Sequence, residues 1–430
     1  MQRTALHHPE RRADAVRPSW TMMKPEEQLK IITRNAVHVE TEAELLAKLR
    51  EGRPLRVKYG ADPSAPDLHL GHSVTLRAMR DLQDLGHQIV FIIGDFTGML
   101  GDPSGKSQTR PQLTREQVEA NAETYARQVS KILDMERAEV RYNSEWLGAL
   151  TPYDVIRLAA QATVAQMLAR DDFGQRYRDN QPLGVHELLY PIFQGYDSVA
   201  VEADIELGGT DQIFNFLFAR ELQRGVGQTP QIPITRPLIP GLDGQQKMSK
   251  SLGNYVGLTD PPDEMYGKLM SIPDALMEQY FRLCTDVPEA EIEQMDRGMA
   301  SGGLNPRDAK MRLAREIVGT YHSPEAAEAA QEGFTRLFAG GKKDPGLETL
   351  LEAAEEAVLA AELEGQGVWV SKALVLAGLV PSASEARRLV QQGGVWVGEG
   401  RASDPQAEIT LTEGLLLRVG KRRVRVVRFG

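Results

Sequence analysis

Residues 30 to 255 alternate between short apolar runs and stretches with the periodicity of amphipathic helices. Five of the runs read as strands, at residues 56–61, 88–93, 139–142, 204–207 and 231–234. Predicted helices, for example 115–133 and 153–169, lie between them. This alternation predicts an α/β fold in which a parallel sheet carries helices on both faces. Ligands of such sheets bind beyond the carboxyl ends of the strands, where the strand order reverses.

The rest of the chain divides by composition. We predict a disordered arm at 1–23, the sheet domain at 24–255, a helical domain at 256–345, an acidic linker helix within 346–366 and a small basic α+β domain at 367–430. The arm has no apolar core, so it does not resemble a secretory signal. No apolar stretch approaches the length of a membrane span, and the single cysteine, Cys284, excludes a disulfide framework and a cysteine-based zinc site. These features predict a cytoplasmic protein without a membrane partner.

Charge is distributed unevenly along the chain. The formal net charge is −10, but residues 367–430 contain ten basic and five acidic side chains, which gives +5 there and −15 elsewhere. A basic module on an acidic body is typical of nucleic-acid binding. A solvated charged surface is the alternative interpretation.

Two short motifs about 180 residues apart carry the strongest chemical signal. His69-Leu70-Gly71-His72 follows the first predicted strand and opens a helix, whose free N–H groups and dipole favour phosphate. Two histidines at i and i+3 share one face, and Gly71 allows a nucleotide to approach the backbone. Imidazole N–H groups can stabilise charge that develops on phosphate oxygens. The sequence offers no third ligand that would make this a metal site.

The second motif is Lys247-Met248-Ser249-Lys250-Ser251, in a glycine-flanked loop. Its two lysines, three residues apart, can place positive charge on the outer phosphates of a nucleoside triphosphate. A solvated basic turn is the alternative for this motif alone. Together the two motifs predict nucleotide transfer with pyrophosphate as the leaving group.

Residues 101–107 resemble a Walker A phosphate loop but depart from it, because Leu100 stands where that loop requires glycine. Asp102 would also repel phosphate, so we expect it to meet a cation, such as a substrate ammonium.

Two further groups of polar residues predict a binding pocket. Tyr190, Gln194 and Asp197 form one helical stripe among apolar neighbours, which indicates the hydrogen-bonding wall of a buried pocket. Residues 208–212, Gly-Gly-Thr-Asp-Gln, follow a predicted strand and open a helix. There Asp211 can hold ribose hydroxyls and Gln212 a carboxylate, although a helix cap is the simpler interpretation.

Taken together, these motifs resemble those of a class I aminoacyl-tRNA synthetase, specifically a bacterial tyrosyl-tRNA synthetase, over residues 24 to 429. The resemblance implies a Rossmann-like nucleotide-binding sheet, an anticodon-side helical domain and an RNA-binding tail. It implies tyrosine activation with ATP and Mg²⁺, followed by transfer of tyrosine to the terminal adenosine of tRNA(Tyr). It also implies a homodimer.

The resemblance assigns roles residue by residue. On the ATP side it implies His69, His72, Lys247 and Lys250 as catalytic residues, with Ser64, Gly71, Gly209, Asp211, Met248 and Ser249 as further nucleotide contacts. For tyrosine it implies Tyr190, Gln194 and Asp102 around the ammonium, Gln212 at the carboxylate, and Asp197 with Thr97 at the phenol. For tRNA it implies Lys372, Arg387, Arg388, Lys421 and Arg422.

One position departs from the pattern. Relatives often place a second tyrosine against the phenol, four residues before the aspartate that is Asp62 here, and this chain has Lys58 there with Tyr59 beside it. Lys58 therefore either faces the pocket or is an outward-facing strand residue. Alternatives to the whole assignment are a tryptophanyl-tRNA synthetase, a catalytically retired RNA-binding relative and a small-molecule nucleotidyltransferase.

Overall fold

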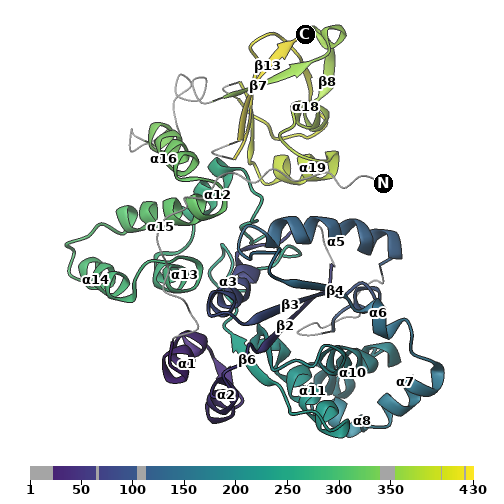
Figure 1. The fold of residues 1–430 in the computed structure, drawn as a ribbon. Helices are drawn as coiled ribbons and strands as arrows, with labels where there is room; N and C mark the ends of the chain where they lie inside the picture. The colour runs from purple at the N-terminus through teal and green to yellow at the C-terminus, as the bar shows by residue number, and fades with distance from the viewer. Residues whose placement is uncertain (1–22, 64–66, 104–112, 339–353, 399, 421–422) are drawn as a thin grey trace. The chain divides into compact units, whose positions relative to one another are not determined.

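The computed structural model describes residues 23–63, 67–103, 113–338, 354–398, 400–420 and 423–430 (Figure 1). Its first compact unit runs to Ile239 and also includes Lys247–Ser249, and the second comprises Pro240–Gln246 and the chain from Lys250 onward. Within the described residues, no helix is both long enough and apolar enough to span a membrane.

A six-stranded sheet forms the centre of the first unit. Its strands are β1 (His38–Val39), β2 (Arg56–Ala61), β3 (Gln88–Ile93), β4 (Glu139–Tyr142), β5 (Ile205–Gly209) and β6 (Ile232–Arg236). The spatial order is β1-β6-β5-β2-β3-β4, with β2 to β6 parallel and β1 antiparallel to β6. The predicted parallel sheet is confirmed, but the two-residue edge strand β1 was not predicted because it has no apolar run of its own.

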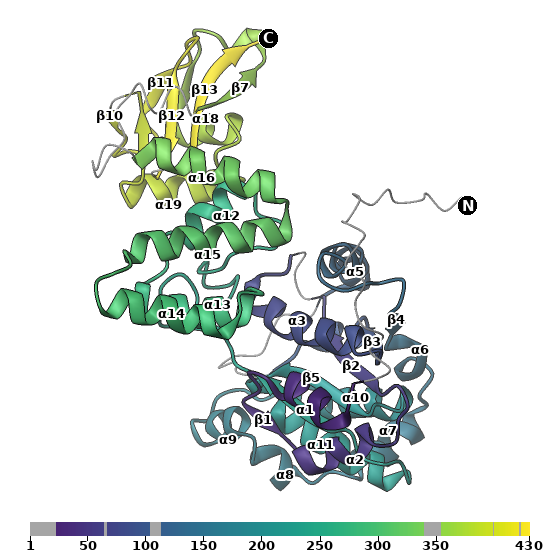
Figure 2. The ribbon, with the colours of Figure 1, turned by 60° about the vertical axis from the view of Figure 1, so that its left-hand side comes forward.

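Helices cover both faces of this sheet. The helices of the unit are α1 (Pro25–Thr33), α2 (Glu42–Leu49), α3 (Leu70–Asp84), α4 (Thr97–Leu100), α5 (Arg115–Val129), α6 (Ser144–Leu147), α7 (Pro152–Ala159), α8 (Val164–Leu168), α9 (Asp171–Arg178), α10 (Val185–Ala200) and α11 (Ile213–Gly225). Figures 1 and 2 show α3 and α5 on one face and α10 and α11 on the other. The helix predicted at 153–169 is two helices, because the Thr163 side chain accepts from the N–H of Gln166 and caps the start of α8.

β3 is apolar on both sides because helices cover both faces of the sheet. Ile89, Val90, Phe91 and Ile92 of β3 and Val57 of β2 are all fully buried. Each such side chain stabilises the fold by roughly 1.5–3 kcal/mol relative to exposure. This burial fixes the strand ends, and the loops that follow those ends carry the site.

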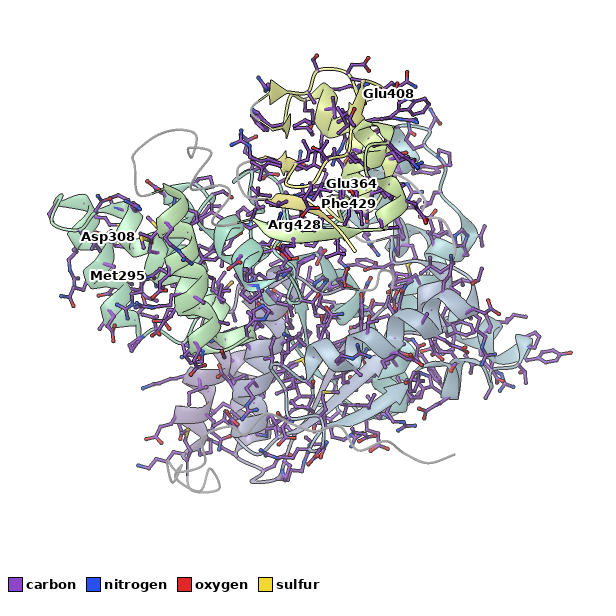
Figure 3. All side chains as sticks on the ribbon, turned by 90° about the horizontal axis from the view of Figure 1, so that it is seen from above. Met295, Asp308, Glu364, Glu408, Arg428 and Phe429 are labelled. Carbon is purple, nitrogen blue, oxygen red and sulfur yellow. The ribbon has the colours of Figure 1, made fainter. Side chains whose placement is uncertain are left out.

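The second unit begins with helices. They are α12 (Pro262–Leu269), α13 (Met277–Cys284), α14 (Glu289–Ala300), α15 (Pro306–Tyr321) and α16 (Pro324–Phe338). Proline stands at the first position of α12, α15 and α16 and at the N-cap of α14, where its missing N–H costs no helical hydrogen bond. Figure 3 labels Met295 on α14 and Asp308 on α15.

The tail has its own core. Its elements are β7 (Glu355–Leu359), β8 (Gly367–Trp369), α18 (Val370–Leu376), α19 (Ala383–Gln391), β9 (Val395–Val397), β10 (Gly400–Arg401), β11 (Glu408–Thr410), β12 (Leu416–Val419) and β13 (Arg423–Phe429). A five-stranded sheet has the order β10-β9-β12-β13-β7, and β8 pairs with β11. Buried side chains from β7, β8, β9, β12, β13 and both helices form one cluster, and Leu416, Val424 and Val426 of β12 and β13 form a second, smaller one.

The prediction of an acidic linker helix at 346–366 is wrong for its described part. Residues 355–359 form β7, which pairs in parallel with β13. Ala357 and Leu359 are buried while Val358 is 66% exposed, which is the alternation of a strand. Arg428 of β13, labelled in Figure 3, pairs with Glu356 at 3.2 Å. The pairing with a distant strand overrides the local helical propensity of the acidic residues. Residues 346–353 lie outside the described residues.

Candidate active site

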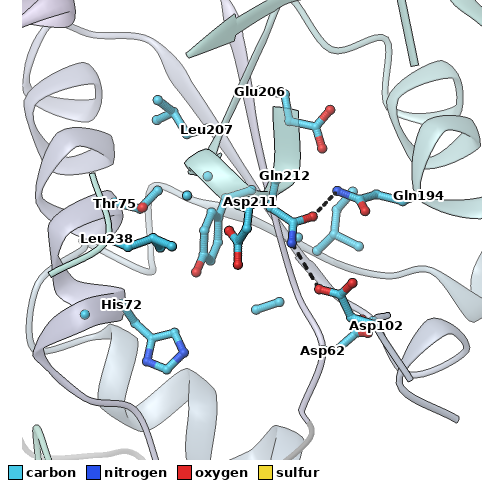
Figure 4. A pocket seen from close by; sticks show the side chains of 18 of the residues that line it. Asp62, His72, Thr75, Asp102, Gln194, Glu206, Leu207, Asp211, Gln212 and Leu238 are labelled. Carbon is cyan, nitrogen blue, oxygen red and sulfur yellow. Dashed lines mark hydrogen bonds between the residues drawn. The ribbon is translucent and has the colours of Figure 1, made fainter. Parts of the chain in front are cut away.

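A pocket opens at the carboxyl ends of β2 to β5 (Figure 4). Its volume is about 290 Å³. Residues 59–62 and 206–209 line it from the ends of β2 and β5, which are neighbours in the sheet. The order of the chain through the sheet reverses between these two strands, since β3 lies on the other side of β2 and β6 on the other side of β5. The pocket therefore lies where an open parallel sheet is expected to bind its ligand.

Asp197 of α10 provides a buried carboxylate in this pocket, since the residue is only 3% exposed. Trp146 Nε1 donates to its Oδ1 at 2.7 Å, and Asn143 Nδ2 donates to its Oδ2 at 3.3 Å. Burial raises the pKa of Asp197 to about 6, against the opposing effects of the Lys58 charge and these two hydrogen bonds. At neutral pH the group is a desolvated anion that can accept a further hydrogen bond.

A second carboxyl group, Asp62, lies directly after β2. It accepts from Thr97 Oγ1 at 2.7 Å and from the Tyr190 hydroxyl at 2.8 Å. Burial raises the pKa of Asp62 to about 7, and the negative charges of Asp102 and Asp197 add to that effect. The carboxyl groups of Asp62 and Asp102 together favour a cationic ligand group at this part of the pocket.

Amide side chains connect the carboxylate of Asp102 to α10 and α11. Gln194 Nε2 donates to Gln212 Oε1 at 3.3 Å, and Gln212 Nε2 donates to Asp102 Oδ2 at 3.0 Å, as Figure 4 shows. Asn215 Nδ2 donates to Gln194 Oε1 at 2.7 Å and to Gln212 Oε1 at 3.1 Å. This network fixes which end of each glutamine amide accepts and which end donates. The structure thus brings Gln194, Gln212 and Asp102 together.

The histidine motif begins α3, and both imidazoles take part in its cap. His69 Nδ1 accepts from the N–H of Gly71 at 3.1 Å, and His72 Nδ1 accepts from the N–H of His69 at 3.2 Å. The two ring centroids are 3.9 Å apart. Because each Nδ1 accepts, the proton of each neutral ring resides on Nε2. The cap therefore sets both rings as Nε2–H donors at a helix end that already favours anions.

The lysine motif reaches the same pocket. Lys247, Met248 and Ser249 line it, and the N–H of Met248 donates to the carbonyl of Ile239 at 2.9 Å. A Cβ atom added to Gly71 would lie 3.7 Å from Cβ of Met248 and 2.9 Å from the His69 ring, so the two motifs adjoin there. Lys247 Nζ lies 3.2 Å from Asp211 Oδ2. Lys250 belongs to the second unit, so its part in this site stays a prediction.

Glycines close the wall between β5 and α11. An added Cβ would lie 2.6 Å from Phe216 at Gly208, and 2.7 Å from Asp211 and 2.8 Å from Leu238 at Gly209. A side chain at either glycine would therefore have to displace its neighbours, the Phe216 ring at Gly208 and the ends of Asp211 and Leu238 at Gly209.

Several predicted residues lie elsewhere. Ser64, Lys421 and Arg422 lie outside the described residues. Lys372 on α18 and Arg387 and Arg388 on α19 are exposed. They belong to the second unit, whereas the residues that line the pocket belong to the first, and they are candidates for an RNA-binding surface of the tail.

Sequence reasoning missed five pocket residues or supports. Asp62 and Asn143 directly follow strands, a position that could have singled them out. Trp146, Asn215 and Glu206 had no usable signal, because their roles depend on contacts made across the fold. The outward-facing interpretation of Lys58 is wrong, because this residue is fully buried. Its neighbour Tyr59 lines the pocket. Burial and the charge of Asp211 raise the pKa of Tyr59 to about 12.

Comparison with known proteins identifies the family. The model of class I tRNA synthetases for tryptophan and tyrosine (W and Y) matches residues 50–339, which is more than half of the chain. The chain belongs to this class I tRNA synthetase family. An S4 domain model also matches residues 368–413 in the tail. Use of ATP follows from membership of a class I synthetase family.

Two curated relatives match this class I synthetase over nearly its whole length. The tyrosine–tRNA ligase of Moorella thermoacetica is 52% identical over 400 residues, covering 92% of this chain and 94% of that protein. The tyrosine–tRNA ligase of Thermotoga maritima is 50% identical and covers 93% and 97%. Among solved structures, the tyrosyl-tRNA synthetase of Archaeoglobus fulgidus complexed with L-tyrosine is 26% identical, with a TM-score of 0.60, and covers 71% of this chain and 99% of that one.

Proposed function

We propose that the chain is a tyrosine–tRNA ligase, which forms tyrosyl-adenylate and pyrophosphate from tyrosine and ATP and then charges tRNA(Tyr). The observation that carries this assignment is the buried carboxylate of Asp197, held by Trp146 and Asn143 in the pocket. A phenol hydroxyl donates to such a group, and phenylalanine would leave it unpaired. The tyrosine–tRNA ligases at about half identity support the same substrate.

Tyrosine recognition in this proposal uses the observed polarity of the pocket. The substrate ammonium meets Asp62, Asp102 and the side chains of Tyr190 and Gln194, where negative charge is concentrated. Gln212 orients the carboxylate of the substrate tyrosine. Asp197 holds the phenol at the other end of the molecule and so fixes how far the carboxylate reaches. The substrate is then positioned for its carboxylate to attack the α-phosphorus.

Adenylate formation requires charge stabilisation and needs no covalent enzyme intermediate. ATP enters as its magnesium complex, with Asp211 and Gly209 at the ribose. The Nε2–H groups of His69 and His72 donate to phosphate oxygens at the end of α3, and Lys247 and Lys250 stabilise the departing pyrophosphate. Lys247 pairs with Asp211 in the structure. Binding of ATP would open this ion pair, with Asp211 then contacting the ribose and Lys247 the phosphates.

For tRNA, the proposal uses the basic tail. The S4 domain match and the exposed Lys372, Arg387 and Arg388 support RNA binding by residues 367–430. Arg418 also stacks over Trp396, with its Cζ 3.9 Å from the ring centroid. The domain bounds and the cytoplasmic location given in the sequence analysis stay predictions.

A homodimer is part of the proposal. Tyr153, Ile156, Val164, Tyr177 and Val185, on α7, α8, α9 and the start of α10, are 64% to 77% exposed. Apolar side chains gathered on adjoining helices are typical of a protein–protein interface. A second copy of the chain is the partner that the family resemblance implies.

The test is ATP–pyrophosphate exchange with each of the twenty amino acids. We expect stimulation by tyrosine and little by phenylalanine. Tryptophan is the informative competitor, because its indole N–H could also donate to a carboxylate and the family includes enzymes for both amino acids. Exchange stimulated by tryptophan alone would reverse the assignment. The absence of exchange with all twenty amino acids would favour a retired RNA-binding protein.

The pH dependence of tyrosine activation gives a further prediction. The pKa of Asp197 is about 6 and that of Asp62 about 7, so both carboxyl groups become protonated as the pH falls from 8 to 5. The ionised forms bind the phenol and the ammonium, and therefore kcat/KM for tyrosine should decrease with an acid limb between about pH 6 and 7. A profile that is flat down to pH 5 would contradict the assignment of these two groups.

A further inference from the structure

Lys58 on β2 is fully buried against the turn of α10 that carries Asp197. Its Nζ lies 2.8 Å from Glu206 Oε1 and 2.8 Å from Ser198 Oγ, and it donates to the carbonyl of Gln194 at 2.9 Å. Three acceptors satisfy the three N–H groups of the ammonium. Gln194 and Ser198 stand on either side of Asp197 in the helix, so Lys58 holds the helical turn from which the phenol-binding carboxylate projects.

We propose that Lys58 is a positioning and specificity-determining residue for the tyrosine phenol, which fixes the Asp197 turn and keeps a positive charge beside its carboxylate. This inference rests on the proposed function. It assigns a role to the position that the sequence analysis left undecided.

The fold makes this charge necessary, because the side chains around Asp197 otherwise add negative charge or none. Glu206 of β5 and Asp62 after β2 are acidic, and both repel a charged Asp197. Tyr190 on α10 itself is neutral at physiological pH, since burial raises its pKa well above its ordinary value. Trp146 and Asn143 donate hydrogen bonds without charge. The positive charge of Lys58 opposes this repulsion and lowers the pKa of Asp197.

Glu206 has a separate role in this arrangement. It binds Lys58 through Oε1, while its Oε2 accepts from Ser198 Oγ at 3.2 Å and from the Gln231 amide. Both charged side chains are essentially inaccessible, at 0% and 1% exposure. Removing Lys58 alone would leave a buried anion, which is destabilising, and the experiment therefore needs a variant that removes both charges.

The experiment compares Lys58→Met, Glu206→Gln and the double variant K58M/E206Q with the unaltered full-length protein. Pyrophosphate exchange is measured with tyrosine and with phenylalanine between pH 5.5 and 9, and KM for ATP serves as an internal control. The double variant has no unpaired buried charge, so it decides the question if Lys58→Met fails to fold.

Both variants that lack Lys58 are expected to show an acid limb for tyrosine displaced to higher pH. Since that limb starts near pH 6, kcat/KM for tyrosine at pH 7 should fall about twofold for a displacement of one unit and about tenfold for two. Phenylalanine does not use the carboxylate charge. Its kcat/KM should therefore change less than about threefold, which corresponds to the loss of at most one uncharged contact. Glu206→Gln should leave the limb unchanged or displace it to lower pH, because a repelling charge is removed.

An acid limb that stays in place in the double variant, or equal losses for tyrosine and phenylalanine, would overturn the role of Lys58 and show only a structural contribution. That result differs from failure of the proposed function. In the latter case the unaltered protein itself would give no tyrosine-dependent exchange.

Discussion

Replacement of Asp197 by alanine is expected to lower kcat/KM for tyrosine by roughly 10- to 100-fold, which corresponds to a hydrogen bond to a charged group worth about 1.5–3 kcal/mol. Activity with phenylalanine should stay the same or increase, because an apolar ring no longer faces an unpaired anion. The discrimination between the two amino acids would then be lost. Exchange kinetics with both substrates at pH 8 measure this ratio.

The loss should not come from unfolding. The pKa of Asp197 is about 6, above the ordinary value for aspartate, so the folded state binds the proton more tightly than the unfolded chain. The ionised form therefore costs folding free energy above pH 6, and its removal relieves that cost. Asp197→Asn is the matched control, since it keeps the shape and removes the charge. A variant that folds, as judged by thermal unfolding, yet still separates tyrosine from phenylalanine as well as the native protein does would contradict the pocket assignment.

Removal of residues 354–430 is expected to reduce charging of tRNA(Tyr) at least roughly tenfold at physiological salt, while tyrosine-dependent exchange changes less than about threefold. The physical reason is that basic contacts to phosphate supply much of the affinity for nucleic acid. The described residues that line the pocket all lie in the first unit, and none of them belongs to the tail. Initial rates of aminoacylation and of exchange, measured on the same preparation, test the separation.

The boundary of this truncation follows from the tail sheet. A cut at residue 367 would leave β7 without β13 and expose the buried Ala357 and Leu359. A matched variant in which Lys372, Arg387 and Arg388 become glutamate keeps the tail and reverses its exposed charge. It should show the same selective loss of charging. Equal loss of both activities in the truncated and the charge-reversed proteins would show that the tail is structural.

The sequence allowed most of the sheet to be predicted because short runs with apolar residues alternate with helical stretches, and β3, covered on both faces, is the clearest such run. The bounds of β2, β3 and β4 agree with the predicted 56–61, 88–93 and 139–142. Elements defined by a partner far along the chain could not be found in this way. β1 needs β6, and β7 needs β13, whose pairing turned a predicted helix into a strand.

The site shows the same division. Residues in short motifs, such as His69, His72, Asp197 and Gln212, could be named from spacing alone, and the structure brings them to one pocket. Their supports could not, because a hydrogen bond such as that from Trp146 to Asp197 joins residues 51 positions apart. The orientation of Lys58 depended on burial beneath α10, which strand alternation alone left undecided.

The most direct test is a crystal structure of the full-length protein with a non-hydrolysable tyrosyl-adenylate analogue. The phenolic oxygen is expected within about 2.5–3.0 Å of an Asp197 carboxylate oxygen, with the ammonium beside Asp62 and the phosphate at the N-terminus of α3 near His69 and His72. An analogue bound with its phenol directed away from Asp197, or with its phosphate far from both histidines, would contradict the account.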